Sequence, residues 1–312
     1  MRVLQSYVSR FLGYWEPFRI DMLIASAIQW KSVFPGDYLV LNVSPDIESY
    51  IKSKVTDLPW DEIYFKYGFD NHESEFYYDS GRFKMSLDQT EPFISLDSDV
   101  YVFPEFRNER NLRMLQDVKS GKPEFLVEDL PWTIQPPPFS RSEFSKQVLD
   151  ILAVTEDRDF ENKMLNTGFF ATIPELAKKV SEKVLAVQKC FETDRGEANY
   201  NFRFHEFASS TVPIMILNRE GVKIKAFDGW GMIHTCRCLC VLPEQQLRNF
   251  YIKEEYSTSD LGFARRLSYW KSFCKQVIEQ GSITRKEAVS LMYRVKDELE
   301  RKEKQTKLSN II

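Results

Sequence analysis

Strand-like and helix-like segments alternate over the first hundred residues of the chain. Residues 2–9 are rich in β-forming side chains, and residues 19–33 place apolar side chains on one helical face before a Pro-Gly pair. The run Tyr-Leu-Val-Leu-Asn-Val at 38–43 is almost wholly apolar, which is typical of a strand buried on both faces. Apolar residues at four-residue steps then predict a helix over 47–58.

The alternation continues in weaker form to residue 106. Residues 62–67 predict a third strand, residues 82–89 a short helix, and the apolar run at 93–96 a fourth strand. Strands and helices in this succession indicate parallel βαβ units. The predicted fold class is therefore α/β, with a Rossmann-like, mostly parallel sheet flanked by helices.

The rest of the chain shows three further patterns. Residues 121–140 are rich in Pro and predict an irregular loop. Residues 212–217 and 222–227 are apolar and flank a short polar turn, which predicts a hairpin or a pair of strands. Amphipathic stripes within 263–277 and 288–299 predict two C-terminal helices.

These patterns divide the chain into two parts. We expect a sheet-containing domain over residues 1–256 and a helical C-terminal extension over residues 257–312. Thr284 and Glu287 form a capping box that begins the last helix. Each apolar stripe of the extension needs a partner, which is either the main domain or another protein surface.

Composition narrows the class of protein. Apolar residues make up 43% of the chain and aromatic residues 14%, enough for a substantial core, so wholesale disorder is excluded. The net charge of −4 does not favour a polyanion as the main partner. Apolar runs stay well short of the ~20 residues of a membrane span, and the N-terminus is typical of a first strand rather than a signal peptide. Five cysteines, an odd number, indicate reduced thiols, and we expect a cytoplasmic protein.

Two phosphate-binding devices are missing from the sequence. Glycine is scarce, with 12 residues, and neither G-x-G-x-x-G nor G-x-x-x-x-G-K-[ST] occurs. Their absence weakens assignment as a dehydrogenase, a kinase or a P-loop NTPase. No G-x-S-x-G turn is present to hold a nucleophilic serine, which weakens assignment as a serine hydrolase.

The segment over residues 91–106 carries the most informative chemistry. A buried strand runs into Asp97-Ser98-Asp99, and a second apolar strand leaves it. Two carboxylates two residues apart at a strand end can both reach one divalent cation, and such a cation neutralises a diphosphate leaving group. The carboxyl end of a strand is also where open α/β sheets bind ligands. The alternative is a simple Asx turn between two strands.

A second Asp-x-Asp match, at Asp157 and Asp159, has a different context. Chance predicts about one such match in a chain of this composition. This one follows a helical stripe and lies in a charged stretch with no strand after it. We interpret it as a solvated loop.

The order strand, Asp-x-Asp, strand near residue 100, after three βα units, resembles nucleotide-sugar-dependent glycosyltransferases of the GT-A fold. The resemblance covers residues 1–240 and is similar in detail to a poorly characterised bacterial GT-A-like group. It implies a GT-A-like sheet domain, with Asp97 and Asp99 as metal ligands and His234 as a late histidine ligand. Taken alone, His234 also fits a hydrogen-bonded, half-buried residue without a metal.

The resemblance also implies residues that bind the donor sugar nucleotide. Arg82 and Lys84 precede the Asp-x-Asp strand, where GT-A enzymes commonly carry a basic donor-binding residue, and Ser98 lies within the motif. Asn166 and Gly168 resemble a turn that lines the donor-sugar pocket in several GT-A families. An ordinary strand-to-helix connection explains that turn equally well.

By the same resemblance, the end of the first strand holds the nucleotide base. Gln5, Ser6 and Tyr7 lie there, and Tyr7 is available to stack on the base. Glu206 lies where GT-A enzymes often carry a catalytic base, and Glu128 and Asp129 are rival candidates. An inverting enzyme needs such a base to deprotonate the acceptor hydroxyl, whereas a retaining enzyme manages without it. Each of these three acids also fits a surface or purely structural carboxylate.

These features predict a metal-dependent glycosyltransferase that uses Mn²⁺ or Mg²⁺ and a nucleoside-diphosphate sugar, with a UDP-sugar as the first expectation. The expected acceptor is a glycan, a lipid-linked glycan or another hydroxyl, and a nucleic-acid acceptor is compatible with a local basic patch. Two alternatives stay open. One is a non-catalytic α/β binding or assembly protein on a degenerate GT-A scaffold. The other is a metal-dependent nucleotidyltransferase, which usually carries a Gly-rich phosphate loop that this chain lacks.

Overall fold

A computed structural model describes ten segments of the chain, which form two compact units. The described residues are 1–7, 17–67, 80–128, 132–133, 139–161, 163–165, 167–195, 204, 207–234 and 260–309. The first unit comprises Met1–Trp15, Gly36–Asp97 and Asn108–Gly229, and the second comprises Glu16–Pro35, Ser98–Arg107 and Trp230–Ile312. Within the described part of the chain, no helix combines the length and the apolar character that crossing a membrane requires.

The first unit is built on a seven-stranded sheet with the order β10-β6-β9-β4-β1-β2-β3. The strands are β1 (Arg2–Tyr7), β2 (Tyr38–Val43), β3 (Glu62–Tyr64), β4 (Phe93–Leu96), β6 (Phe125–Val127), β9 (Phe169–Thr172) and β10 (Ile224–Ala226). All neighbours pair in parallel except β9, which runs antiparallel to both β4 and β6. The predicted α/β class with a mostly parallel sheet is confirmed.

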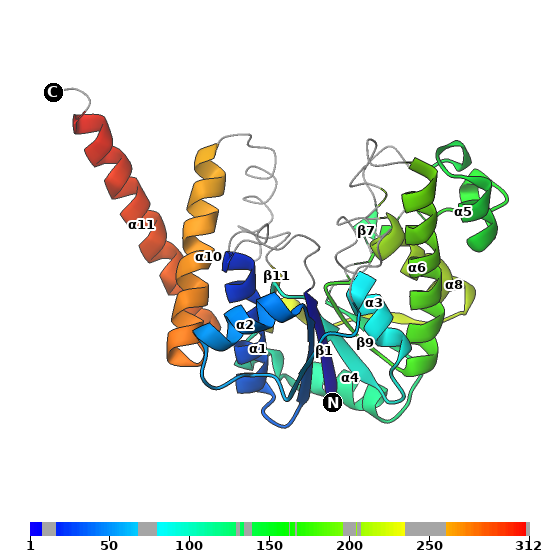
Figure 1. Cartoon of the computed structure of the whole chain (residues 1–312), viewed down its shortest axis with the longest axis horizontal. Coiled ribbons are helices and arrows are strands. Elements are labelled where there is room, and N and C mark those ends of the chain that lie inside the picture. Colours follow the sequence, from blue (N-terminus) through cyan, green and yellow to red (C-terminus); the bar gives the residue numbers. More distant parts are fainter. Residues whose placement is uncertain are drawn as a thin grey trace. The chain divides into compact units, whose positions relative to one another are not determined.

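Several helices of the first unit flank its sheet (Figure 1). They are α2 (Pro45–Lys54), α3 (Ser80–Leu87), α4 (Glu109–Lys119), α5 (Lys146–Ile151), α6 (Pro174–Arg195) and α8 (Val212–Arg219). Helix α6 packs against α3, α5 and α8, and Figure 1 shows it as the long helix among them. Buried side chains of α3, α5, α6 and α8, including Phe83, Val148 and Val184, belong to one apolar cluster with residues of β1, β4 and β9. A further two-stranded sheet pairs β7 (Trp132–Thr133) with β8 (Lys163–Met164).

Residues 212–217 form a helix, so the predicted strand there is wrong. Helix α8 follows directly on η6, a short π-helix over Phe207–Thr211, and carries Pro213 in its first turn. Every residue from Val212 to Leu217 is buried, so the sequence shows no polar face from which a helical period can be read. The following strand β10 pairs in parallel with β6 instead of forming a hairpin.

In its described residues, the second unit contains a two-stranded ribbon and three α-helices. They are α1 (Pro17–Val33), β5 (Val100–Val102), β11 (Met232–His234), α10 (Asp260–Gln280) and α11 (Arg285–Ser309). Helix α10 packs along α1, and α11 packs on α10 (Figure 1). Their core contains Tyr101 of β5 together with Trp270, Phe273 and Cys274 of α10. The predicted helical C-terminal part is confirmed, whereas its predicted boundary at 256/257 lies outside the described residues.

Candidate functional site

Strands β1 and β4 lie at a topological switch point of the sheet. From β1 the chain continues outward to β2 and β3, and it then returns to form β4 on the other side of β1. In open α/β sheets, ligands bind at the carboxyl ends of the strands where the order reverses in this way. Because Leu4 pairs in register with Ser95, Ser6 and Asp97 follow two residues later at that same edge.

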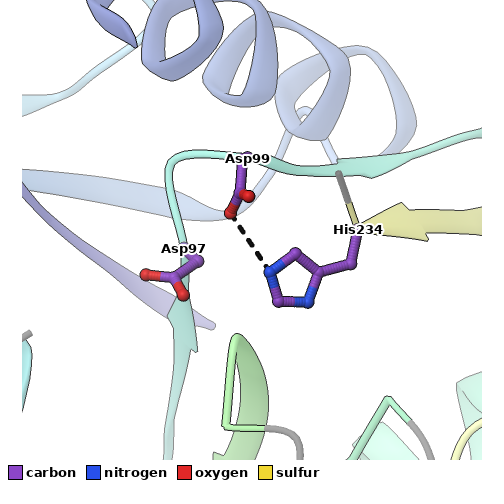
Figure 2. A group of neighbouring side chains, drawn as sticks. All are labelled: Asp97, Asp99 and His234. Carbon is purple, nitrogen blue, oxygen red and sulfur yellow. Dashed lines mark ion pairs between the residues drawn. The ribbon is translucent and has the colours of Figure 1, made fainter. Parts of the chain in front are cut away.

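Asp99 and His234 are brought together by one antiparallel ribbon. His234 of β11 pairs in register with Val100 of β5, and Asp99 directly precedes that residue. The Nε2 atom of His234 lies 3.2 Å from Oδ1 of Asp99, and Figure 2 shows the imidazole directed at this carboxylate. Both side chains are largely buried, with exposed fractions of 7% and 15%. The pair is therefore preorganised and little screened by solvent.

The ribbon that carries this pair is anchored within the second unit. The Ser26 hydroxyl of α1 donates to the Val100 carbonyl at 2.6 Å, and the Tyr101 ring stacks on Trp270. Burial, reinforced by the nearby Cys274 and Asp99, holds the pKa of Tyr101 well above its ordinary value, so the phenol stays neutral. Gly231 allows the close approach at the start of β11, because a Cβ there would clash with the backbone of Phe106. These contacts set the direction of β5 and hence the place of Asp99.

Asp97, Asp99 and His234 form a group of three ligand-bearing side chains (Figure 2). The ligand atoms they offer all lie within 4.8 Å of one another. Oxygen and nitrogen ligands of one bound cation lie roughly 3–5 Å apart, given bonds of 2.0–2.6 Å. Two carboxylates and a neutral imidazole fit a divalent cation, and the carboxylates favour a hard one such as Mg²⁺ or Mn²⁺.

Arg82 approaches the first aspartate of this group. Its side chain is 5% exposed, and Nη1 lies 3.3 Å from Oδ2 of Asp97. Nη1 also donates to the Thr167 carbonyl at 2.5 Å, and Nη2 donates to the Thr167 hydroxyl at 3.3 Å. The Asp97 amide donates to the carbonyl of Gly168 at 2.7 Å, which extends the pairing of β4 with β9. Asp97 is therefore held at both its backbone and its carboxylate.

The candidates at the end of β1 differ in their surroundings. Gln5 is fully buried, and its side-chain oxygen accepts from Trp60 Nε1 at 2.8 Å, so the structure places it in the core. Ser6 and Tyr7 are half-buried, as are Lys84 and Ser98.

Asn42 is a residue of this edge that sequence reasoning missed. Its amide donates to the Ser6 hydroxyl at 3.1 Å and to the Tyr67 carbonyl at 2.8 Å. Its oxygen accepts from the backbone N–H groups of Lys66 and Tyr67, both at 3.1 Å. Asn42 thus holds the segment after β3 against the end of β1. The signal was present as the one polar side chain in an otherwise apolar strand.

Three predicted site residues, Asn166, Glu206 and Asp129, lie outside the described residues. The second Asp-x-Asp forms a 3-10 turn over Asp157–Asp159. Backbone N–H groups of Glu156 and Thr155 hydrogen-bond the carboxylate of Asp159 and lower its pKa to about 2. None of the motif's three residues is buried, which agrees with the predicted solvated loop, but the short strand β8 begins four residues later, so the expectation that no strand follows is wrong.

Comparison with known proteins gives distant structural likenesses. No protein-family model and no curated protein matches the chain. Among solved structures, the galactosyltransferase LgtC in complex with donor and acceptor sugar analogues is 11% identical, with a TM-score of 0.40 over 85% of this chain and 100% of that one. A nucleoside-diphosphate-sugar pyrophosphorylase from Vibrio cholerae RC9 is 11% identical, with a TM-score of 0.41 over 81% of this chain and 100% of that one. A 4-diphosphocytidyl-2C-methyl-D-erythritol synthase from Anaerococcus prevotii DSM 20548 is 13% identical, with a TM-score of 0.37 over 81% and 95%. Likenesses at this level establish neither a shared activity nor shared site residues.

Proposed function

We propose that the chain is a metal-dependent glycosyltransferase of the GT-A type, which transfers a sugar from a nucleoside-diphosphate sugar to a hydroxyl group of an acceptor. The observation that supports this best is the position of Asp97, directly after β4 and beside the end of β1. Nucleotides bind at such switch points in open α/β sheets. Asp99 and His234 add ligand atoms beside Asp97, and proteins commonly bind nucleotide phosphates through a divalent cation held by carboxylates.

Asp97, Asp99 and His234 would hold Mn²⁺ or Mg²⁺. When bound, this cation supplies a Lewis acid that neutralises the negative charge of a diphosphate leaving group. Tyr7, half-buried at the end of β1, would stack on the nucleotide base. Lys84 would add positive charge for the donor, and a UDP-sugar is the first donor to test.

The acceptor side of the reaction rests on residues outside the described segments. Glu206 and Asp129 stay the predicted candidates for the base that deprotonates the acceptor hydroxyl. A glycan or a lipid-linked glycan is the acceptor class that we propose.

On the donor side, Asn166, with Ser98 and Gly168, stays the predicted contact for the donor sugar.

Binding of donor and metal tests the proposal first. A nucleoside diphosphate at about 100 times its Kd stabilises the folded state by about 2.7 kcal/mol, which raises Tm by about 5 °C. We expect this rise with UDP plus Mn²⁺ and its loss when Mn²⁺ is removed by a chelator. Asp99→Asn should lose it as well. Asp157→Asn is the matched control, because it changes the other Asp-x-Asp and keeps an acceptor oxygen for the amide of Arg141.

Turnover separates the proposal from its alternatives. The protein is incubated with Mn²⁺ and a panel of UDP- and other nucleoside-diphosphate sugars. We expect slow release of the nucleoside diphosphate by hydrolysis, and faster release when an acceptor is present. Release of pyrophosphate from a nucleoside triphosphate and a sugar phosphate would instead identify a nucleotidyltransferase. A chain that binds no nucleotide with or without Mn²⁺ contradicts both enzyme assignments and leaves a binding or assembly protein.

A further inference from the structure

The guanidinium of Arg82 is enclosed by protein atoms of the first unit. Only 5% of the side chain is exposed, whereas Asp97, which it faces at 3.3 Å, is 27% exposed. Its Nη1 and Nη2 atoms also donate to the carbonyl and the hydroxyl of Thr167. A guanidinium withdrawn from water to this extent needs an anionic partner and hydrogen-bond acceptors, and Asp97 and Thr167 supply them.

Thr167 is itself anchored to the π-helix η6. Its hydroxyl donates to the Ser209 carbonyl at 3.1 Å, and the backbone N–H of Leu165 donates to the Ser210 carbonyl at 2.9 Å. A π-helix departs from the usual α-helical ladder, and such segments are frequent at functional sites. A continuous series of contacts therefore runs from η6 through Thr167 to Arg82 and then to the carboxylate of Asp97.

This arrangement is better suited to orienting a metal ligand than to contacting the donor sugar nucleotide. A carboxylate has two oxygens with about four acceptor sites, so Asp97 can accept from Arg82 and still offer an oxygen to a cation. The planar, forked guanidinium fixes the direction of that carboxylate, which a single point charge does not. Outer partners that orient metal ligands in this way tune affinity for the ion.

We propose that Arg82 is a positioning residue for the metal centre: it holds Asp97 in the orientation of a ligand, with Thr167 and η6 as its support. The proposal rests on the proposed function only in taking Asp97 as a metal ligand. It differs from the role that the GT-A resemblance implies, in which the basic residue of this segment binds the donor.

Mn²⁺ binding to the protein alone, without nucleotide, tests this role. Arg82→Lys keeps the positive charge but loses the forked guanidinium. A change in the Kd for Mn²⁺ in this variant therefore reports the lost orientation of Asp97 and not a change in electrostatic repulsion of the ion. We expect its Kd for Mn²⁺, measured by calorimetry or by the loss of the free-ion EPR signal, to rise about 10-fold. The Kd for UDP at saturating Mn²⁺ should change less than about 2-fold, on the order of 0.4 kcal/mol. An unchanged Kd for Mn²⁺ with a 10-fold weaker Kd for UDP would overturn the proposal and make Arg82 a donor contact.

Two further variants complete the test. Thr167→Val removes the hydroxyl between Arg82 and Ser209 without changing charge, and we expect a smaller rise in the Kd for Mn²⁺, about 3-fold. It decides the question if Arg82→Lys proves unfolded by circular dichroism. Arg110→Lys is the matched control, because Arg110 also donates to a backbone carbonyl, that of Ala226, but has no part in the proposed centre.

Failure of this proposal can be told from failure of the proposed function. If the wild-type chain binds no Mn²⁺, the metal centre itself is contradicted, and the role of Arg82 with it. If the wild-type chain binds Mn²⁺ and Asp99→Asn does not, the centre stands. Wild-type Kd values for Mn²⁺ in both Arg82→Lys and Thr167→Val would then overturn the positioning role alone.

Discussion

At the scale of single residues, the proposed chemistry depends on a few side chains, and His234 is the most distant of them in sequence. It lies 3.2 Å from Asp99 only because β11 pairs with β5. We expect His234→Gln to raise the Kd for Mn²⁺ at least 10-fold, since even outer partners of a metal site contribute that much. Calorimetry with Mn²⁺ measures it, with Asp157→Asn as the control. A wild-type Kd would restrict the ligands to the two carboxylates.

Asn42 gives a second prediction at this scale, on stability. Replacement by Leu removes the side-chain oxygen that accepts from the backbone N–H groups of Lys66 and Tyr67. These partly buried N–H groups then lose that hydrogen bond. We expect Asn42→Leu to lower the free energy of unfolding by about 2–3 kcal/mol, measured by urea denaturation at pH 7. Ser49→Ala on the exposed surface of α2 should stay within about 0.5 kcal/mol of wild type. Equal stabilities of the two variants would contradict the role of Asn42.

At the scale of elements, the start of α11 is set by a capping box. The backbone N–H and the hydroxyl of Thr284 both donate to the Glu287 carboxylate, and the Glu287 N–H donates back to the Thr284 hydroxyl. These donors hold the pKa of Glu287 below its ordinary value of 4.5. The carboxylate therefore stabilises the folded state above pH 4.5, and this contribution is lost as the pH falls through the lowered pKa.

The capping box is tested by Thr284→Ala and Glu287→Gln. Loss of a Thr cap costs about 1 kcal/mol, so we expect Thr284→Ala to lower the free energy of unfolding by that amount at pH 7. The difference between wild type and Glu287→Gln should shrink as the pH is lowered below 4.5. Chemical denaturation at pH 7, 5 and 3 checks both, and a difference that grows toward acid pH would contradict the assigned sign.

For the whole molecule, the C-terminal helices are part of a core. Residues Ile283, Ala288, Leu291 and Val295 lie in one cluster with side chains of α1, β5 and α10. The amide of Gln29 exchanges hydrogen bonds with the backbone of Ile283, at 2.9 and 2.8 Å. Large apolar side chains contribute about 1.5–3 kcal/mol each when buried. The free energy that these cluster residues contribute together is therefore comparable to the 5–15 kcal/mol by which a typical domain is stable.

Truncation tests this assignment. We expect a chain ending at Gly281 to be insoluble or to lose cooperative unfolding. A chain ending at Arg301 keeps all four of these cluster residues and should unfold like the full chain. Circular dichroism with urea denaturation compares them. If the shorter chain stays soluble and cooperatively folded but loses self-association in size-exclusion chromatography, α11 serves a partner surface instead.

Local sequence patterns determined the elements that have two unlike faces or clear ends. The strands at 38–43 and 93–96 have the bounds that their apolar runs predict, and the Asp-x-Asp motif directly follows the second of them. The amphipathic stripe of α10 likewise predicted a helix with a buried side. Such patterns depend on neighbours two to four residues apart, so they can be read without knowing the fold.

Tertiary structure decided what depends on distant partners. Residues 212–217 of helix α8 are all buried, so their sequence carries no period that tells a short helix from a strand. Asp99 meets His234 through the register of β5 with β11, and Arg82 turns to Asp97 through the pairing of β4 with β9 that brings Thr167 beside it. Register and burial arise from packing between segments that are far apart in the chain. The local spacing of residue types therefore does not determine which distant polar side chains are buried next to one another.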